Sequence, residues 1–455
     1  MDNPEGARHG SSIASDSAET LLLKLLLYVM GFAASVVISR GLGPSGRGEY
    51  YLPLVTAGTL VAVCKLGLEQ ANVFLFGTRG LPINSLSGQN GLVAVVMGPL
   101  GLLGMLLALP FFPTLFGDTP PVLLLLAALT IPFSLHAQFS GGLLTLLGQV
   151  TWQFRASLMA SVVQVALLLG LWLLSWFAVG PVLAVNLATI VLGWALTVWA
   201  FRGTPTRWIR WDAALLRNTL QQSLLLHLGM VLFFLHLRLD MFMVKAMRGA
   251  AALGQYSLSV TLAETILLAT DSLAIAILPR QMSNTVQEAA LISLRSARMN
   301  CLIGVGLGVL WATTGLPIIR VFFGAQFTPA YLPLVALLPG MVFLGMQRVC
   351  GGPALRAGRP GRITGIYAAT LLCNAGLNLW WIPMWDILGA ALASSVSYTV
   401  GAFMFVAWTA RLAGVPVSDG ILPRRSDLVT LWRSTLESIR AIQGTSLAGI
   451  MRHGL

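Results

Sequence analysis

Six charged side chains lie in a stretch of the chain, from Arg238 to Asp271, that is otherwise almost entirely apolar, and they are the first candidates for chemistry. They are Arg238, Asp240, Lys245, Arg248, Glu264 and Asp271. A charge at the centre of a bilayer costs about 3 kcal/mol unless its side chain faces protein or water. The stretch therefore holds either paired structural contacts or one wall of a polar path through a membrane.

Arg238 is the strongest of these candidates for binding an anion. Arginine stays charged, and its planar fork of donors suits phosphate. Asp240, two residues further on, points to a different side of a helix. The alternative is that Arg238 is the buried partner of a carboxylate such as Glu264.

Glu264 and Asp271 are seven residues apart, which is nearly two helical turns, so their carboxylates share one helix face. Paired carboxylates in a membrane bind a cation or exchange protons. They would serve equally well to neutralise Arg238 or Lys65, and the sequence leaves both interpretations open.

Two apolar runs near the N-terminus carry further charges. Lys65 and Glu69 are four residues apart and can pair directly on a helix. They form either a self-contained ion pair or a charged patch at the cytoplasmic end of a cavity. Lys24 lies on one helix face with Tyr28, and it either faces a cavity or extends to the inner membrane surface.

No pattern indicates a cofactor or a metal. The four cysteines lie in or at the ends of apolar runs without CxxC spacing, which favours buried packing residues. The segment GLGPSG at 41–46 matches GxGxxG, but it connects two apolar runs rather than a strand and a helix, which favours a tight turn. We therefore expect neither cofactor nor metal.

The composition is that of a membrane protein with many spans. Of the 455 residues, 56% are hydrophobic and 10% are charged, whereas soluble domains carry about 25% charged residues. In a soluble protein, the net charge of +12 would indicate nucleic-acid binding. Here it is better explained by basic residues on cytoplasmic loops, so we expect no nucleic-acid partner.

Apolar runs of about 20 residues cross the hydrocarbon as helices, and they predict an all-α polytopic protein. Twelve spans are expected, at 20–39, 50–74, 90–112, 121–142, 153–177, 180–201, 220–245, 251–277, 299–322, 331–354, 363–384 and 388–410. The expected domains are a disordered cytoplasmic N-terminus (1–19), an N-lobe (20–217), a C-lobe (218–411) and a cytoplasmic tail (412–455). In the tail we expect either an amphipathic helix on the inner leaflet or loose order.

The basic residues predict which side each connection faces. With the N-terminus in the cytoplasm, 20 of the 28 Lys and Arg residues lie in cytoplasmic segments, and five, including Arg47, lie on the opposite side. This bias places both termini in the cytoplasm. The two halves also echo each other weakly, because Gly48-Glu49-Tyr50 and Gly254-Gln255-Tyr256 each open a span. Internal duplication, which is common among transporters, and chance are both open explanations.

Several short motifs, in order, resemble one known family. They are Arg238-Leu239-Asp240, Leu253-Gly254-Gln255-Tyr256-Ser257, Ala263-Glu264, Leu278-Pro279, SRGLGPSGRGEYYLPL at 39–54, Lys65-Leu66-Gly67-Leu68, Gly324-Ala325-Gln326-Phe327 and Gly389-Ala390-Ala391-Leu392-Ala393. Over about residues 20–410, the chain resembles the polysaccharide-biosynthesis flippases of the multidrug/oligosaccharidyl-lipid/polysaccharide (MOP) exporter superfamily.

The resemblance implies two six-helix lobes around a central cavity and transport by alternating access. It implies a polyprenyl-diphosphate-linked oligosaccharide as substrate in the bacterial inner membrane, with membrane lipid and other polysaccharide assembly proteins as partners. The implied headgroup-attracting cations are Arg238, Lys65, Lys24 and Arg348. The residues that would tune these cations or couple an ion are Asp240, Glu264, Asp271 and Glu69. A multidrug exporter of the same superfamily and a membrane glycosyltransferase or polymerase are the alternatives.

Overall fold

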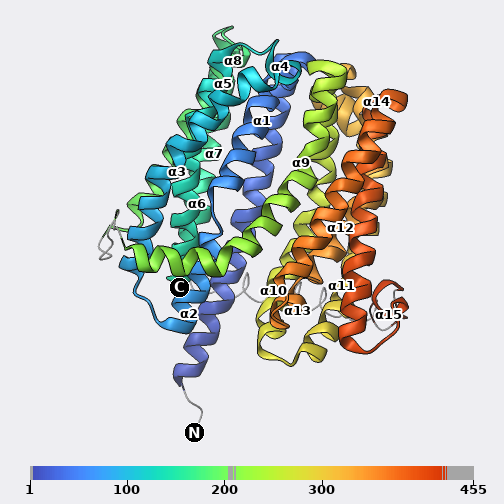
Figure 1. Cartoon of the computed structure of the whole chain (residues 1–455). Coiled ribbons are helices and arrows are strands. Elements are labelled where there is room, and N and C mark those ends of the chain that lie inside the picture. Colours follow the sequence, from blue (N-terminus) through green and yellow to red (C-terminus); the bar gives the residue numbers. More distant parts are fainter. Residues whose placement is uncertain (1–3, 203–208, 210–211, 423, 426, 428–455) are drawn as a thin grey trace, which may run out of the picture. The chain divides into compact units, whose positions relative to one another are not determined.

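The computed structural model describes residues 4–202, 209, 212–422, 424–425 and 427, and all regular structure in these residues is helical (Figure 1). The helices of the first half are α1 (Pro4–Cys64), α2 (Leu68–Arg79), α3 (Ile83–Phe111), α4 (Pro113–Phe116), α5 (Pro121–Ala128), α6 (Thr130–Leu146), α7 (Val150–Leu173) and α8 (Val179–Trp199). Those of the second half are α9 (Ala213–Ala263), α10 (Thr265–Ser283), α11 (Val286–Ile318), η1 (Ile319–Phe323), η2 (Ala325–Ala330), α12 (Tyr331–Val349), α13 (Gly352–Arg356), α14 (Pro360–Ala413) and α15 (Ser418–Ile421).

Nine stretches of the described residues are long and apolar enough to cross a membrane. Three of them are of double length, namely Leu22–Cys64, Ser223–Ala274 and Pro360–Ala413. Each contains one residue whose backbone leaves the helical range, and these residues are Gly43, Gly249 and Asp386. A break at each divides three stretches into six, which brings the nine to twelve. The predicted fold class, an all-α polytopic protein with about twelve spans, is confirmed.

The backbone breaks recur at a fixed separation. Gly43 (φ 67°, ψ −176°) and Gly249 (φ 84°, ψ −174°) have nearly the same conformation and are 206 residues apart. The separation of Gly48 and Gly254, which begin the two echoed tripeptides, is also 206 residues. Glycine adopts positive φ without the penalty that a Cβ atom imposes. The recurrence favours internal duplication over chance.

Two later turns repeat in the same way. Gly148 and Gly358 have φ of 72° and 64° and precede α7 and α14. Ser175 and Asp386 have φ of 59° and 56°, although neither is glycine. These pairs are separated by 210 and 211 residues, close to the 206 residues between Gly43 and Gly249.

Gly48 and Gly254 make the same contact in opposite directions. A Cβ atom on Gly48 would overlap the backbone oxygen of Ala250, and one on Gly254 would overlap that of Pro44. Positions 44 and 250 are also 206 residues apart. Equivalent residues of the two copies therefore pack against each other with a reciprocal, locally two-fold pattern.

The chain forms two compact units. Unit 1 consists of Met1–Leu258, Pro317–Tyr331 and Ala375–Ala390, and unit 2 of Ser259–Leu316, Leu332–Asn374 and Ala391–Leu455. Helix α9 thus contributes to both units. The lobe boundary expected at residue 217 stays a prediction.

In unit 1, α1 packs along α7, α3 packs along α6, and α8 packs against both α6 and α7 (Figure 1). A buried apolar cluster joins α1, α5, α7 and α8, with Ile38, Tyr50, Leu123, Leu168 and Leu183 among its members. This packing fixes α7 and α8 beside α1, so polar side chains on α6, α7 and α8 are held by rigid helices.

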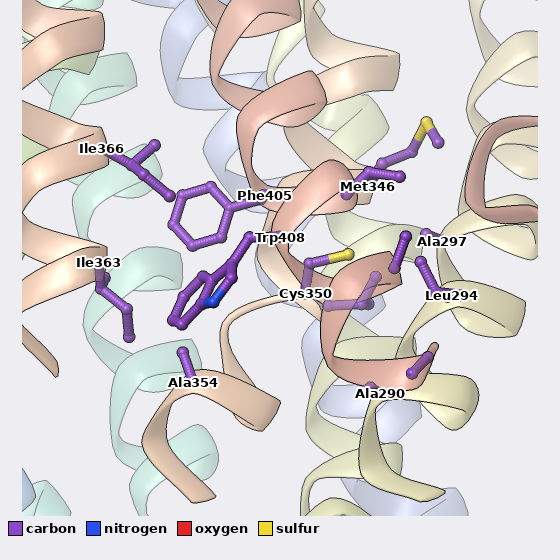
Figure 2. Close-up of a cluster of buried hydrophobic side chains, with 14 of the residues drawn as sticks. Ala290, Leu294, Ala297, Met346, Cys350, Ala354, Ile363, Ile366, Phe405 and Trp408 are labelled. Atoms are coloured by element: carbon purple, nitrogen blue, oxygen red, sulfur yellow. The ribbon is translucent and has the colours of Figure 1, made fainter. Parts of the chain in front are cut away.

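In unit 2, a larger apolar cluster joins α11, α12 and α14 (Figure 2). Leu294 of α11, Met346 of α12 and Phe405 and Trp408 of α14 surround Cys350, whose side chain is fully buried. Cys350 therefore acts as a small packing residue, as its apolar sequence context indicates.

Three local expectations concern the two ends of the chain and Arg47. Helix α1 begins at Pro4, and the disorder expected for residues 1–19 stays a prediction. Most of the predicted amphipathic tail, residues 428–455, lies outside the described residues. Arg47, assigned to an outer connection, is only 4% exposed, and its guanidinium donates hydrogen bonds to the hydroxyls of Ser35, Ser39 and Ser257.

Candidate functional site

Lys65 lies directly after the end of α1. The helix stops because Leu66 and Gly67 adopt positive φ, 52° and 72°, before α2 begins. Lys65 Nζ lies 3.2 Å from Oε1 and 3.3 Å from Oε2 of Glu69. The ion pair that the four-residue spacing predicts is therefore present. Each side chain keeps about a quarter of its surface exposed, 26% for Lys65 and 27% for Glu69.

A cavity of about 380 Å³ lies beside Lys65 in unit 1, and we call it the lysine cavity. Its walls come from the Leu54–Lys65 segment and from α6, α8 and α9. Gln138 of α6 and Asn186 of α8 contribute amides, and Phe234 of α9 contributes an aromatic ring. Among the described residues that line it, Lys65 is the one charged residue. The ion pair thus borders a space that a polar ligand can occupy.

A second cavity, of about 350 Å³, lies among α6, α7 and α8 of unit 1, and we call it the amide cavity. Its hydrogen-bonding side chains are Ser134, Gln138, Gln153, Ser157, Ser161, Gln164, Asn186, Thr189, Trp194 and Thr197. It shares Ser134, Gln138, Asn186 and Ile190 with the lysine cavity. The two cavities therefore have a common wall.

These amides carry no charge, so they are not among the charged candidates of the sequence. A signal was present in α7, where Gln153, Ser157, Ser161 and Gln164 follow one another at steps of four, four and three residues. That spacing places them on one face of an otherwise apolar helix. This uncharged polar stripe is a sequence signal for one wall of the amide cavity.

Arg238 lies one turn of α9 beyond Phe234. Its guanidinium carbon is 5.9 Å from the centre of the Phe234 ring, which itself lines the lysine cavity. Asp240 is 1% exposed and accepts hydrogen bonds from the Tyr256 hydroxyl at 2.5 Å and from the Met241 amide at 2.8 Å. The hydrogen bond from Tyr256 to Asp240 therefore joins the two segments of α9 on either side of the Gly249 break.

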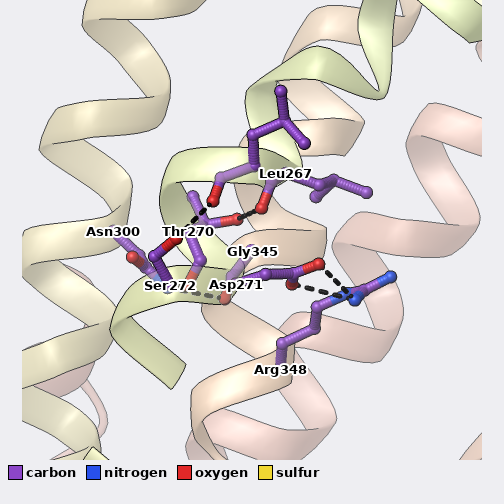
Figure 3. Close-up of polar contacts among 8 residues, drawn as sticks. Leu267, Thr270, Asp271, Ser272, Asn300, Gly345 and Arg348 are labelled. Atoms are coloured by element: carbon purple, nitrogen blue, oxygen red, sulfur yellow. Dashed lines mark hydrogen bonds and ion pairs between the residues drawn. The ribbon is translucent and has the colours of Figure 1, made fainter. Parts of the chain in front are cut away.

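Asp271 and Arg348 pair in unit 2 (Figure 3). Arg348 Nη1 lies 2.8 Å from both carboxylate oxygens of Asp271. Next to this pair, the Asn300 amide donates to the backbone oxygen of Gly345 at 3.0 Å and so joins α11 to α12. The sequence had offered Arg238 and Lys65 as partners for Asp271, and the structure shows Arg348 instead. Both side chains remain partly exposed, Arg348 at 29% and Asp271 at 37%.

The remaining candidates lie apart from these pairs. Lys24 Nζ lies 5.2 Å from the centre of the Phe154 ring, a cation–π contact between α1 and α7. Glu264 is half-buried at the junction of α9 and α10, where its amide donates to the Val260 oxygen at 2.8 Å. Within the described part of the chain, no three His, Cys, Asp or Glu side chains gather as a metal site would require.

The sequence and fold are similar to those of known proteins. A family model described as polysaccharide biosynthesis protein matches residues 13–284. No curated protein matches the chain. Among solved structures, the chain is similar to the lipid II flippase MurJ in an inward closed conformation, with 16% identity, a TM-score of 0.72 and coverage of 92% of each chain.

Two further solved structures show the same fold. An inward-facing multidrug resistance transporter of the MATE family, within the MOP superfamily, has 14% identity and a TM-score of 0.67, with coverage of 85% of this chain and 95% of that one. A MOP-superfamily transporter from Pyrococcus furiosus has 16% identity and a TM-score of 0.66, with coverage of 88% and 94%. At these identities the likeness concerns the fold alone.

Proposed function

Because the chain belongs to the polysaccharide biosynthesis protein family, we propose that it is a flippase for a polyprenyl-diphosphate-linked oligosaccharide. It moves this lipid from the inner to the outer leaflet of the bacterial inner membrane by alternating access, as a step in polysaccharide biosynthesis. It is a transporter and not an enzyme. The family and the fold support a multi-pass membrane transporter with the MOP-superfamily fold.

The lysine cavity is the observation that carries this proposal. A diphosphate is anionic, and a lysine ammonium gives it charge-assisted hydrogen bonds that are stronger than neutral ones. Gln138 and Asn186 add uncharged donors and acceptors for sugar hydroxyls in the same lining. The polyprenyl tail needs no protein pocket, because it stays in lipid. A cation beside neutral amides suits the diphosphate and sugar of such a headgroup.

The other charged candidates receive supporting roles in this proposal. The headgroup is attracted by Arg238, which lies over the Phe234 ring, and by Lys24 and Arg348. Glu69 and Asp271 moderate the cations with which they pair. Asp240 and Glu264 tune local charge or couple an ion. Both termini lie in the cytoplasm, and other polysaccharide assembly proteins supply and receive the lipid.

A cation-coupled multidrug exporter is the second candidate, because MATE transporters share the fold. A cationic drug would gain from a carboxylate at its binding surface. The described lining of the lysine cavity offers a cation instead, and the lining of the amide cavity offers neutral groups. These linings favour the lipid-linked oligosaccharide.

A flipping assay in proteoliposomes tests the proposal, with a fluorescent polyprenyl-diphosphate sugar as probe. We expect Lys65→Ala to slow movement by at least about tenfold, since it removes a charge-assisted hydrogen bond. Lys65→Arg should keep most of the rate. Arg238→Ala, compared with Arg238→Lys, tests the second cation in the same way.

Two variants make the result specific. Lys65→Ala leaves Glu69 unpaired, so Lys65→Ala combined with Glu69→Gln separates loss of the cation from the cost of an isolated carboxylate. Arg320→Ala removes an exposed cation far along the sequence and should leave flipping unchanged. If the wild type moves none of several glycolipids, the flippase proposal is wrong and the exporter becomes the leading candidate.

A further inference from the structure

The amide cavity is built by three helices that each present an uncharged polar stripe. Helix α6 provides Ser134 and Gln138, and α7 provides the stripe that begins at Gln153. Helix α8 provides Asn186, Thr189, Trp194 and Thr197. Polar side chains in a span are usually satisfied by neighbouring helices. Here, a space of about 350 Å³ separates them, within the range of roughly 300–1,000 Å³ typical of small-molecule sites.

The lining is polar without being charged. The described residues around the amide cavity include no Asp, Glu, Lys or Arg. Each glutamine or asparagine carries two donors and an acceptor. Four lining hydroxyls donate to backbone oxygens of their own helices, so they offer acceptor oxygens to a ligand, namely those of Ser157, Ser161, Thr189 and Thr197. The Oδ1 atom of Asn186 is buried and accepts no hydrogen bond from the described residues, while the Asn186 side chain is in hydrogen-bond contact with the Tyr50 hydroxyl. An acceptor in that state calls for a ligand that carries hydrogen-bond donors.

An aromatic ring completes the cavity. The Trp194 indole nitrogen donates to His136 Nδ1 at 3.1 Å, and its ring makes an edge contact with Phe133 at a centroid distance of 5.1 Å. These contacts hold the indole in one orientation. A fixed aromatic face beside amides and hydroxyls suits a sugar ring, which has an apolar C–H face and a rim of hydroxyls.

We propose that the amide cavity binds an uncharged sugar, the first residue of the glycan next to the diphosphate, and that it selects hydroxyl- or acetamido-bearing sugars over acidic ones. The inference rests on the proposed function. The position of this sugar follows from the wall that the two cavities share. With the diphosphate at Lys65, the sugar attached to it lies beyond Gln138 and Asn186, in the amide cavity. A uronate carboxylate would be desolvated in this lining without a cation to pair with it.

Binding is the test, and it does not require transport. The full chain in lipid nanodiscs is titrated with three probes: polyprenyl diphosphate, the same lipid carrying N-acetylglucosamine, and the same lipid carrying N-acetylglucosaminuronic acid. The two sugars differ only at the sixth carbon, where a carboxylate replaces the hydroxymethyl group. We expect the neutral sugar to bind about tenfold more tightly than the bare diphosphate lipid. The acidic sugar should show no such gain.

Variants locate the gain. Gln153→Leu and Gln164→Leu keep the side-chain volume but lose an amide that lines the amide cavity alone, and each should weaken binding of the neutral-sugar lipid about three- to tenfold without changing binding of the bare lipid. Gln221→Leu replaces an exposed amide of α9 and serves as the matched control. Trp194→Phe removes the indole donor and should also lower the gain.

The outcomes distinguish this inference from the flippase proposal. Equal affinity for neutral and acidic sugars would overturn the inference, as would a gain that survives both glutamine substitutions. A flippase that moves the lipids while showing no sugar-dependent gain in binding would keep its proposed function and lose this site. A neutral-sugar gain in a protein that moves no lipid would keep the site and remove the flippase proposal.

Discussion

At the scale of single residues, Asp271 has two candidate roles. Its carboxylate either pairs with Arg348 to stabilise the fold or couples an ion. A pairing role predicts that Asp271→Ala and Arg348→Ala each destabilise the fold and that the double variant loses less than their sum. We expect a coupling of about 1 kcal/mol, because both side chains keep part of their exposure. Unfolding in nanodiscs measures it through a double-mutant cycle. Additive effects would show that Asp271 does not depend on Arg348.

Tyr256 is a second residue with a defined contact. Its hydroxyl donates to the buried carboxylate of Asp240 at 2.5 Å. Tyr256→Phe removes this donor and should lower the free energy of unfolding by about 1.5–3 kcal/mol, the range for hydrogen bonds to charged groups. Tyr28→Phe is the control, because that side chain is 49% exposed. Equal loss in both variants would show that the Asp240 contact contributes little.

The sequence predicted the Lys65–Glu69 pair but not the Asp271–Arg348 pair, and this difference has a physical cause. Lys65 and Glu69 are four residues apart in the chain, so they stay close even though the backbone turns at Leu66 and Gly67 between α1 and α2. Arg348 lies 77 residues beyond Asp271, and only the packing of α10 against other helices of unit 2 determines that pair. Local ion pairs can therefore be predicted from sequence, whereas long-range ones require the fold.

At the scale of elements, the segment around α15 is held to α11 by one arginine. Arg298 donates to both carboxylate oxygens of Asp427, at 2.7 and 3.1 Å, and to the backbone oxygen of Asp419. Arg298 is one of the 20 basic residues that the sequence places in cytoplasmic segments. Its side chain is nevertheless only 8% exposed, and that of Asp427 is 1% exposed. The pair thus serves as a structural attachment for residues 418–427.

We expect Asp427→Asn to loosen this segment. Hydrogen exchange at pH 7 should become faster for the amides of residues 418–427 and stay unchanged in α14. Asp118→Asn, at an exposed position, is the control. Unchanged exchange in the Asp427 variant would show that apolar contacts, such as those of Gly420 with Leu294 and Val406, hold the segment without the ion pair.

The same contact has a pH dependence of known sign. The hydrogen bond from Arg298 holds the pKa of Asp427 below its ordinary value of 3.8. A carboxylate with a lowered pKa contributes stability above its unfolded-state pKa, and that contribution is lost as the pH falls through the folded-state pKa. Wild-type exchange in this segment should therefore approach that of the variant only below about pH 4.

At the scale of the whole molecule, hydropathy predicted the number of spans because bilayer thickness fixes the length of an apolar helix. The sequence could not show that Arg47 is buried, since a basic residue beside a turn resembles any loop charge. Nor did it reveal the amide cavity, whose polar residues come from three helices. Duplication was visible as a tripeptide echo, and the backbone angles of Gly43 and Gly249 support it.

The duplicated architecture makes one prediction of its own. Gly48→Ala and Gly254→Ala each place a methyl group against a backbone carbonyl and should destabilise the protein by about 1–3 kcal/mol or prevent folding. Gly306→Ala and Gly365→Ala, where a Cβ atom meets nothing within 4 Å, should be tolerated. The yield of folded protein after purification measures the difference. Normal yields for both contact variants would contradict the reciprocal packing.

The reciprocal contact also constrains the history of the chain. After a duplication, the two copies are normally able to diverge independently as each acquires new roles. Positions 48 and 254 are an exception, because a mutation at either one meets the backbone of the other copy. Natural selection therefore acts on both in the same direction, whatever cargo a descendant carries. Lineages that have exchanged one substrate for another should still retain this pair of glycines.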